Sequence, residues 1–266
     1  MSSQDSAAPE ITIIVSCYNE EKFITDTIQN VINALKSTGH SYEIIVIDDL
    51  SRDGSVNRIH DYMKNHPEEP VTLKVNPVNR GLANNYIEAA FLGTGKYYRL
   101  CCGDDSEAPE ALVNIFKHIG AADIVVPCQD QNQVTGKAPY RRLLSRTFTF
   151  LVNLISGYHL KYYNGMAIHL RYNVMRWHPS SYGFGFQADI LTRLLDEGAS
   201  YIQVTSYGND RKGGGSTALT MRNFLSVTHT LLELAIRRLR RILYGRKMPK
   251  PVEIKLEDNA GEKRLH

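Results

Sequence analysis

Short apolar runs alternate with amphipathic segments along the first half of the chain. The apolar runs have the length of buried strands and lie at residues 11–16, 42–47, 71–76, 96–101 and 124–127. Between them, apolar residues recur at helical spacing, which predicts helices at residues 20–36, 55–65, 81–92 and 109–119. Strands that alternate with helices at these lengths indicate βαβ units. The pattern therefore predicts an α/β fold with a mostly parallel central sheet flanked by helices.

The second half of the chain is less regular. Its pattern predicts helices at residues 141–155, 186–197 and 221–244, with short strands at 167–170 and 201–204. A glycine-rich stretch at 207–217 predicts a loop before the last helix. We expect a flexible tail at 1–9, one globular domain at 10–217, a C-terminal amphipathic basic helix at 218–247 and a charged tail at 248–266.

Charge, cysteine content and hydropathy exclude several classes of protein. A net charge of +3 over 266 residues is too small to indicate a nucleic-acid partner. The four cysteines contain no CxxC pair, which argues against a zinc site or a disulfide framework and fits reduced thiols in the cytosol. No apolar run reaches the roughly 18 residues that span a bilayer, and the first residues do not resemble a signal peptide. We expect a cytoplasmic protein, or one that lies peripherally on the cytoplasmic face of a membrane.

Pairs of carboxylates follow two of the predicted strands. Because parallel strands end at one edge of a sheet, we expect Asp48, Asp49, Asp104 and Asp105 to share that edge. Mg²⁺ and Mn²⁺ favour one or two carboxylates together with phosphate oxygens. Asp104 with Asp105 therefore predicts a Mg²⁺ or Mn²⁺ site for a diphosphate, where the cation acts as a Lewis acid. Alternatively, Asp105 with Ser106 caps the next helix.

Other strand ends supply candidates for nucleotide contacts. Asp48 or Asp49 is placed to accept a hydrogen bond from a ribose hydroxyl or a base N–H, unless both only shape a turn. Arg80 and Gly81 follow the third strand, where glycine permits close approach of the backbone and arginine suits phosphate. The alternative for that pair is a plain helix N-terminus.

Three features of the second half suggest an acceptor site. Asp189 begins a helix and is the candidate general base, or it only complements the helix dipole. Arg211 and Ser216 flank three glycines in a loop that would bind a diphosphate or an acceptor phosphate, unless it is a surface linker. A second basic patch is either a phosphate site or a solvated face and consists of Arg141, Arg142, Ser145 and Arg146.

The last predicted helix combines an apolar stripe with a cluster of arginines. The cluster consists of Arg237, Arg238, Arg240 and Arg241. Basic amphipathic helices bind anionic membrane surfaces. The same stripe also suits packing on the chain's own domain, or on a second subunit in a homodimer.

Taken in order, these motifs resemble the inverting glycosyltransferases of family 2, which have the nucleotide-diphospho-sugar (GT-A) fold. The resemblance covers roughly residues 10–217. Residues 13–20 are similar to that family's first strand and nucleotide contact, which implies that Tyr18 and Glu20 bind the nucleotide-sugar. Residues 47–55 resemble its Asp-Asp-x-Ser-x-Asp-Gly signature, and residues 79–81 its Asn-x-Gly turn. Cys102 stands where the first acid of the family's Asp-x-Asp motif usually lies, and Asp104 takes the second position.

Within the family, the chain looks most like polyprenyl-phosphate sugar transferases of the dolichol-phosphate mannosyltransferase kind. Residues 141–146 are similar to their phosphate-gripping helix, and residues 211–216 resemble their Arg-x-x-Gly-x-Ser loop. The resemblance implies metal-dependent transfer from a UDP- or GDP-sugar to a lipid phosphate, with Asp104, Asp189 and Arg211 as catalytic residues. The alternatives are a saccharide acceptor in surface polysaccharide synthesis and a nucleotide-sugar-binding module without turnover.

Overall fold

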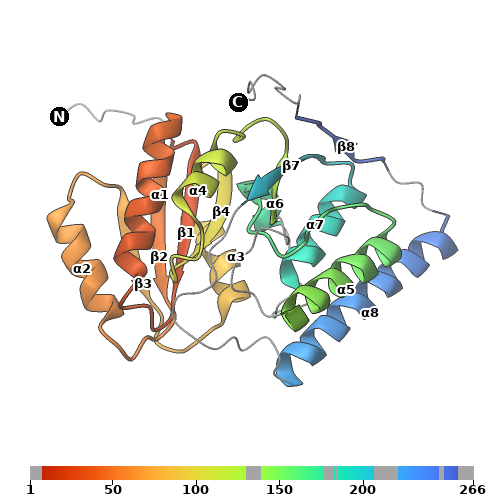
Figure 1. Cartoon of the computed structure of the whole chain (residues 1–266), viewed down its shortest axis with the longest axis horizontal. Coiled ribbons are helices and arrows are strands. Elements are labelled where there is room, and N and C mark those ends of the chain that lie inside the picture. Colours follow the sequence, from red (N-terminus) through yellow and green to blue (C-terminus); the bar gives the residue numbers. More distant parts are fainter. Residues whose placement is uncertain are drawn as a thin grey trace, which may run out of the picture.

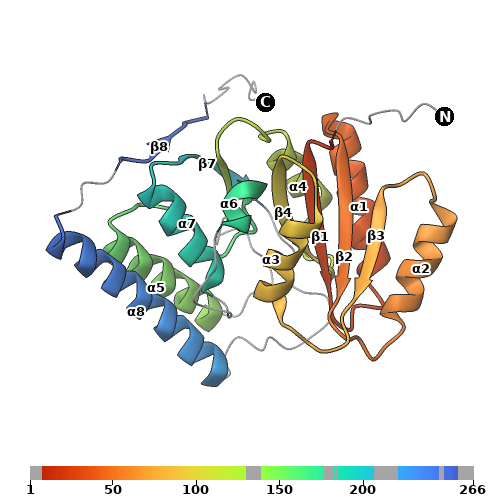
Figure 2. The ribbon, with the colours of Figure 1, turned by 180° about the vertical axis from the view of Figure 1, so that it is seen from behind.

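The fold is a single mixed sheet with helices on both faces (Figures 1 and 2). A computed structural model describes residues 8–129, 139–176, 183, 185–206, 221–245 and 249–256. Within these residues the strands are β1 (Ile11–Cys17), β2 (Tyr42–Asp48), β3 (Val71–Val75), β4 (Tyr97–Cys102), β5 (Ile124–Gln129), β6 (Ile168–Leu170), β7 (Ser200–Ser206) and β8 (Val252–Glu253). Their order across the sheet is β3-β2-β1-β4-β6-β5-β7-β8.

The helices are α1 (Ile24–Thr38), α2 (Ser55–Asn65), α3 (Leu82–Leu92), α4 (Pro109–Phe116), α5 (Pro139–Ser156), α6 (Arg171–Met175), α7 (Phe186–Asp196) and α8 (Met221–Leu243). The predicted α/β fold with a mostly parallel sheet is confirmed. Among the described strands, only the short β6 runs antiparallel to its neighbours, β4 and β5. The pattern did not predict α6 or β8, because five and two residues are too few to show a hydrophobic period.

The core has two layers, one on each face of the sheet. Along β1, Ile13 and Val15 pack with α1, α2 and α4, whereas Ile14 packs in the layer that includes α3, α5 and α7. A strand that is buried on both faces needs apolar residues at successive positions. This requirement explains why β1, β2 and β4 read as continuous apolar runs.

The strand register brings the ends of β1, β2 and β4 to one level. Cys17 at the end of β1 pairs with Asp48, and Ser16 pairs with Cys102. After β4 the chain crosses close to β1, where Gly103 N donates to Ser16 O at 2.9 Å. A Cβ on Gly103 would lie 2.6 Å from that carbonyl oxygen, so glycine is required for this crossing. The crossing positions Asp104, the next residue, at the edge of the sheet.

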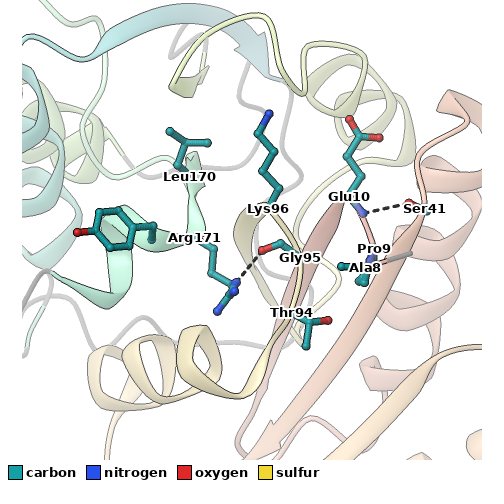
Figure 3. A pocket seen from close by; sticks show the side chains of 10 residues that line it. Ala8, Pro9, Glu10, Ser41, Thr94, Gly95, Lys96, Leu170 and Arg171 are labelled. Atoms are coloured by element: carbon teal, nitrogen blue, oxygen red, sulfur yellow. Dashed lines mark hydrogen bonds between the residues drawn. The ribbon is translucent and has the colours of Figure 1, made fainter. Parts of the chain in front are cut away.

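A cavity of about 530 Å³ opens at the opposite edge of the sheet, beside the starts of β1 and β4 (Figure 3). Arg171 in its wall donates through Nε to Gly95 O and through Nη1 to Ala90 O, which ties α6 to the segment before β4. No predicted site residue lines this cavity. In the described ranges, no helix has the length and apolar character needed to cross a membrane.

Candidate active site

The loops after β1 and β2 are tied together by hydrogen bonds. Asn19 N donates to Ser51 Oγ at 2.9 Å, and Glu20 N donates to Ser55 Oγ at 2.9 Å. Asn19 adopts a left-handed backbone with φ 58°, which asparagine tolerates better than most residues. These contacts leave the Tyr18 side chain about half exposed and Glu20 largely buried. An exposed aromatic ring at this edge suits stacking on a planar base.

Asp48 closes a turn beneath the edge of the sheet. Its Oδ1 accepts a hydrogen bond from Ser51 N at 2.9 Å, and its side chain is fully buried. Burial, aided by the nearby Asp48 charge, raises the pKa of the Cys17 thiol to about 12, so that thiol stays neutral. This geometry matches the alternative that Asp48 shapes the turn.

Asp49 holds the loop between β3 and α3. Its Oδ1 accepts from Arg80 N at 2.8 Å and from Asn76 Nδ2 at 2.9 Å, and its Oδ2 accepts from Gly81 N at 2.8 Å. A carboxylate offers about four acceptor positions, so Oδ2 retains capacity for one more donor. Burial alone would raise the pKa of Asp49, but these hydrogen bonds hold it below its ordinary value.

This pKa shift predicts how Asp49 contributes to stability as the pH changes. A carboxyl group whose pKa is lowered by folding stabilises the protein above its unfolded pKa of about 3.9, and this contribution is lost as the pH falls through the folded pKa. We expect Asp49→Asn to lower the free energy of unfolding by about 1–3 kcal/mol at pH 7. The difference from wild type should shrink as the pH falls below 4, as measured by urea unfolding. A difference independent of pH would contradict this assignment.

The β3–α3 loop also carries Arg80 and Gly81. Gly81 has φ 79°, a left-handed conformation that favours glycine, and it precedes the first residue of α3. Arg80 forms an ion pair with Glu88 of α3 at 2.7 Å, and its side chain is 42% exposed. Asn76 was not predicted from the sequence. Asn76 is buried and donates hydrogen bonds to both Asp49 and Asn85. The sequence feature that could have identified this role is an amide side chain directly after an apolar strand.

The two carboxylates after β4 have different surroundings. Asp105 has φ 48° and turns to α1, where its Oδ1 accepts from Asn30 Nδ2 at 2.9 Å and its backbone N donates to Thr27 Oγ1. Asp104 is half-buried at the end of β4. The geometry therefore favours Asp104 over Asp105 as the carboxylate at the edge of the sheet.

The residues present fit a divalent cation that is shared with a substrate. The described part of the chain contains no group of three or more His, Cys, Asp or Glu side chains that would enclose a metal ion. Mg²⁺ and Mn²⁺ do not need such a cage, since one or two carboxylates with substrate phosphates and water suffice. Burial raises the pKa of the Cys102 thiol and keeps it neutral in the metal-free protein. Asp104 is thus the residue that would hold the cation.

An ion pair between a buried arginine and a partly exposed glutamate supports the loop that contains Asp104. Arg99 of β4 is fully buried, pairs with Glu107 and donates through Nε to Met166 O at 3.0 Å. The pair joins the middle of β4 to the loop that follows it. The sequence analysis missed this role, although a single arginine inside an apolar strand is an unusual pattern.

Asp189 lies in an ion-pair cluster between α7 and α8. Its Oδ1 accepts from Arg193 Nε and from Arg237 Nη1, both at 3.0 Å. Asp196, two turns further along the same face of α7, pairs with Arg241 at 2.5 Å and with Arg237 at 3.4 Å. Asp189 therefore does more than complement the dipole of α7: its ion pairs support a structural role in which it links α7 to α8. Its role as a general base stays a prediction.

The remaining predicted residues belong to other segments of the chain than the loops after β1, β2 and β4. Arg141, Arg142, Ser145 and Arg146 are in the first turns of α5, and Arg146 is exposed. Arg211 and Ser216 lie outside the described residues. The structure therefore groups Tyr18, Glu20, Asp48, Asp49, Arg80, Gly81, Asp104 and Asp105 around one end of the sheet.

This geometry agrees with a comparison against known families. The model of glycosyl transferase family 2 matches residues 12–176, which is more than half of the chain. The chain belongs to glycosyl transferase family 2. The match spans β1 through α6 and contains every predicted residue of the sheet edge. The expected membership of the glycosyltransferases is confirmed.

Two bacterial proteins illustrate the sequence similarity. The chain is 32% identical over 161 residues to the poly-beta-1,6-N-acetyl-D-glucosamine synthase of Staphylococcus aureus, a match that covers 55% of this chain and 38% of the relative. It is 28% identical over 169 residues to the synthase of the same name from Staphylococcus epidermidis, covering 58% and 40%. The chain thus matches at most 40% of the length of these two relatives.

Solved structures show the same GT-A fold. Glucosyl-3-phosphoglycerate synthase from Mycobacterium tuberculosis, in complex with phosphoglyceric acid, matches with a TM-score of 0.65 at 18% identity, covering 86% of this chain and 81% of that one. A mannosyltransferase from Pyrobaculum calidifontis, in complex with GDP-Man and Mn²⁺, gives a TM-score of 0.56 at 19% identity and covers 92% and 67%. At these identities the likeness concerns the fold alone.

Proposed function

We propose that this family 2 protein transfers a sugar from a nucleoside-diphosphate donor to an acceptor, with inversion at the anomeric carbon. The observation that carries the proposal is the convergence of Tyr18, Asp49 and Asp104 at the joined ends of β1, β2 and β4. An aromatic ring, an ionised acceptor and a metal-binding carboxylate suit a base, a ribose or base N–H, and a diphosphate, respectively. Neighbouring structures that hold UDP or GDP-Man with Mn²⁺ or Mg²⁺ support the choice of donor.

On the donor side, each residue has a separate task. The exposed Tyr18 ring stacks on the base, and Asp49 Oδ2 accepts a hydrogen bond from the nucleoside while its remaining contacts fix the loop. Asp49 stays ionised because hydrogen bonds lower its pKa. Asp104 would hold a divalent cation, which would supply positive charge to the diphosphate leaving group. Arg80 lies in the same loop and would approach a phosphate if it left its pairing with Glu88.

The acceptor we favour is a polyprenyl phosphate. A lipid phosphate is largely ionised near neutral pH and needs no general base. The basic first turns of α5, with Arg141, Arg142 and Arg146, supply donors for such a phosphate. We extend this role to Arg211 and Ser216 on the resemblance alone.

A saccharide acceptor is the second candidate, and it rests on the names of the relatives. Both staphylococcal relatives are synthases of a polysaccharide. A sugar hydroxyl requires a base, and Asp189 is the candidate. To act as a base, the Asp189 carboxylate would first have to break its ion pairs with Arg193 and Arg237.

Binding of nucleotides tests the donor site before any acceptor is known. UDP and GDP should each be screened by thermal shift with and without Mn²⁺. A ligand at 100 times its Kd adds about 2.7 kcal/mol to the free energy of unfolding, so a true donor nucleotide raises the midpoint in a metal-dependent way. Asp104→Ala should remove the metal dependence. No shift with either nucleotide, in the presence of Mn²⁺, would contradict the donor site.

A further inference from the structure

Helices α5 and α8 lie side by side (Figures 1 and 2). Each helix has apolar residues on two opposite faces. Phe148 and Val152 of α5 and Leu234 of α8 are buried in the core. The opposite faces carry apolar residues that are each more than half exposed: Leu143, Phe150, Leu154, Leu225, Leu232, Ile236, Leu239 and Leu243. A surface helix of a soluble domain normally presents polar residues outward. Two adjacent helices that break this rule form a surface that requires a partner.

The spacing of these residues makes each outer face a continuous stripe. On α5 the exposed positions 143, 150 and 154 follow helical steps, as do 225, 232, 236, 239 and 243 on α8. Scattered exposed apolar residues are ordinary, but contiguous ones mark an interaction site. Helices with an apolar stripe and a basic flank are typical of proteins that lie in the plane of a membrane interface.

Charge identifies the partner of this surface. Helix α5 contains no Asp or Glu, and α8 contains only Glu233. Arg237 and Arg241 turn inward to the α7 carboxylates, whereas Arg146 and Arg240 remain exposed. A second copy of the chain would bring the same positive charge to the interface, and like charges that face one another oppose association. An anionic lipid surface complements both the charge and the apolar stripes.

We propose that the outer faces of α5 and α8 together form a lipid-binding surface that docks on an anionic membrane interface. The exposed apolar side chains enter the boundary between head groups and acyl chains, and the exposed arginines contact the head groups. This surface does not depend on the proposed transfer reaction, although docking there would bring the enzyme to a lipid acceptor.

Vesicle co-sedimentation without any nucleotide tests the proposal. The protein should sediment with vesicles that contain 30% phosphatidylglycerol in phosphatidylcholine, bind vesicles of phosphatidylcholine alone less well, and bind more weakly at about 1 M salt, where charges are screened. Phe150→Ser on α5 and Leu239→Ser on α8 should each lower partitioning about tenfold. Arg240→Glu should lower it for anionic vesicles only.

Matched variants elsewhere on the surface are the controls. Phe91→Ser on α3 and Arg58→Glu on α2 change side chains that are also exposed, and both should leave partitioning unchanged. Far-UV circular dichroism and a thermal unfolding midpoint like those of wild type verify that the variants are folded. Equal loss in the controls, or no sedimentation of wild type with anionic vesicles, would overturn the proposal. So would light scattering that shows a dimer which ignores vesicles and dissociates in Phe150→Ser or Leu239→Ser.

Discussion

Asp104→Ala is expected to abolish sugar transfer while leaving the fold intact. Asp104 is a half-buried carboxylate at the end of β4, so its removal takes little from the core. A bound cation contributes several kcal/mol to stabilising charge on a leaving diphosphate. The loss of about 4 kcal/mol corresponds to roughly a thousandfold lower kcat/KM. Release of nucleoside diphosphate from the donor measures the effect.

Asp105→Ala is the matched control for this experiment. The Asp105 carboxylate accepts a hydrogen bond from Asn30 on α1, so its removal should cost some stability and far less activity than removal of the Asp104 carboxylate. Equal losses of activity in the two variants would show that both carboxylates hold the cation. Full activity of Asp104→Ala, or wild-type activity that EDTA does not change, would rule out the metal role.

Arg237→Gln should be strongly destabilising, by about 3 kcal/mol in the free energy of unfolding. Arg237 bridges Asp189 and Asp196, whose side chains are 2% and 4% exposed, and it donates to Thr192 Oγ1 at 2.6 Å. Removing the bridge leaves one buried carboxylate without its partner on α8. Urea unfolding of the whole chain gives the measurement.

Arg240→Gln is the control, because Arg240 lies exposed on the same helix. A surface charge of this kind contributes within about 0.5 kcal/mol. If both variants unfold at the same urea concentration, the cluster between α7 and α8 does not hold α8 in place. The arginine cluster predicted from the sequence thus has two parts, and neutralising all four arginines at once would disturb the fold as well as any membrane contact.

The positions of the strands could be predicted from the sequence, because a strand buried on both faces of a sheet is a continuous run of apolar residues. The ends of β1, β2 and β4 were thereby placed together with their carboxylates. The strand at β6 was predicted but its antiparallel direction was not, since a strand of three residues carries no sign of direction. Whether a strand runs parallel or antiparallel depends on the strands it pairs with in the folded sheet.

The roles within the site were harder to predict than its position. Asp48 and Asp49 are adjacent in sequence and look equivalent, yet one closes a turn and the other receives the N–H groups of a loop 31 residues away. The same limit applies to Arg237 and Arg240, which differ only in the helix face that meets α7. Such differences come from tertiary contacts, which periodicity does not encode.

Turnover of nucleotide-sugars tests the central claim most directly. Wild type and Asp104→Ala should each be incubated with a panel of UDP- and GDP-sugars, Mn²⁺, and either a polyprenyl phosphate or an oligosaccharide acceptor, and the release of nucleoside diphosphate and the glycosylated product should be followed. We predict that wild type releases nucleoside diphosphate from at least one donor, with a product on one acceptor class, and that Asp104→Ala does not. Tight nucleotide binding without turnover on any donor would contradict the account and identify a binding module instead.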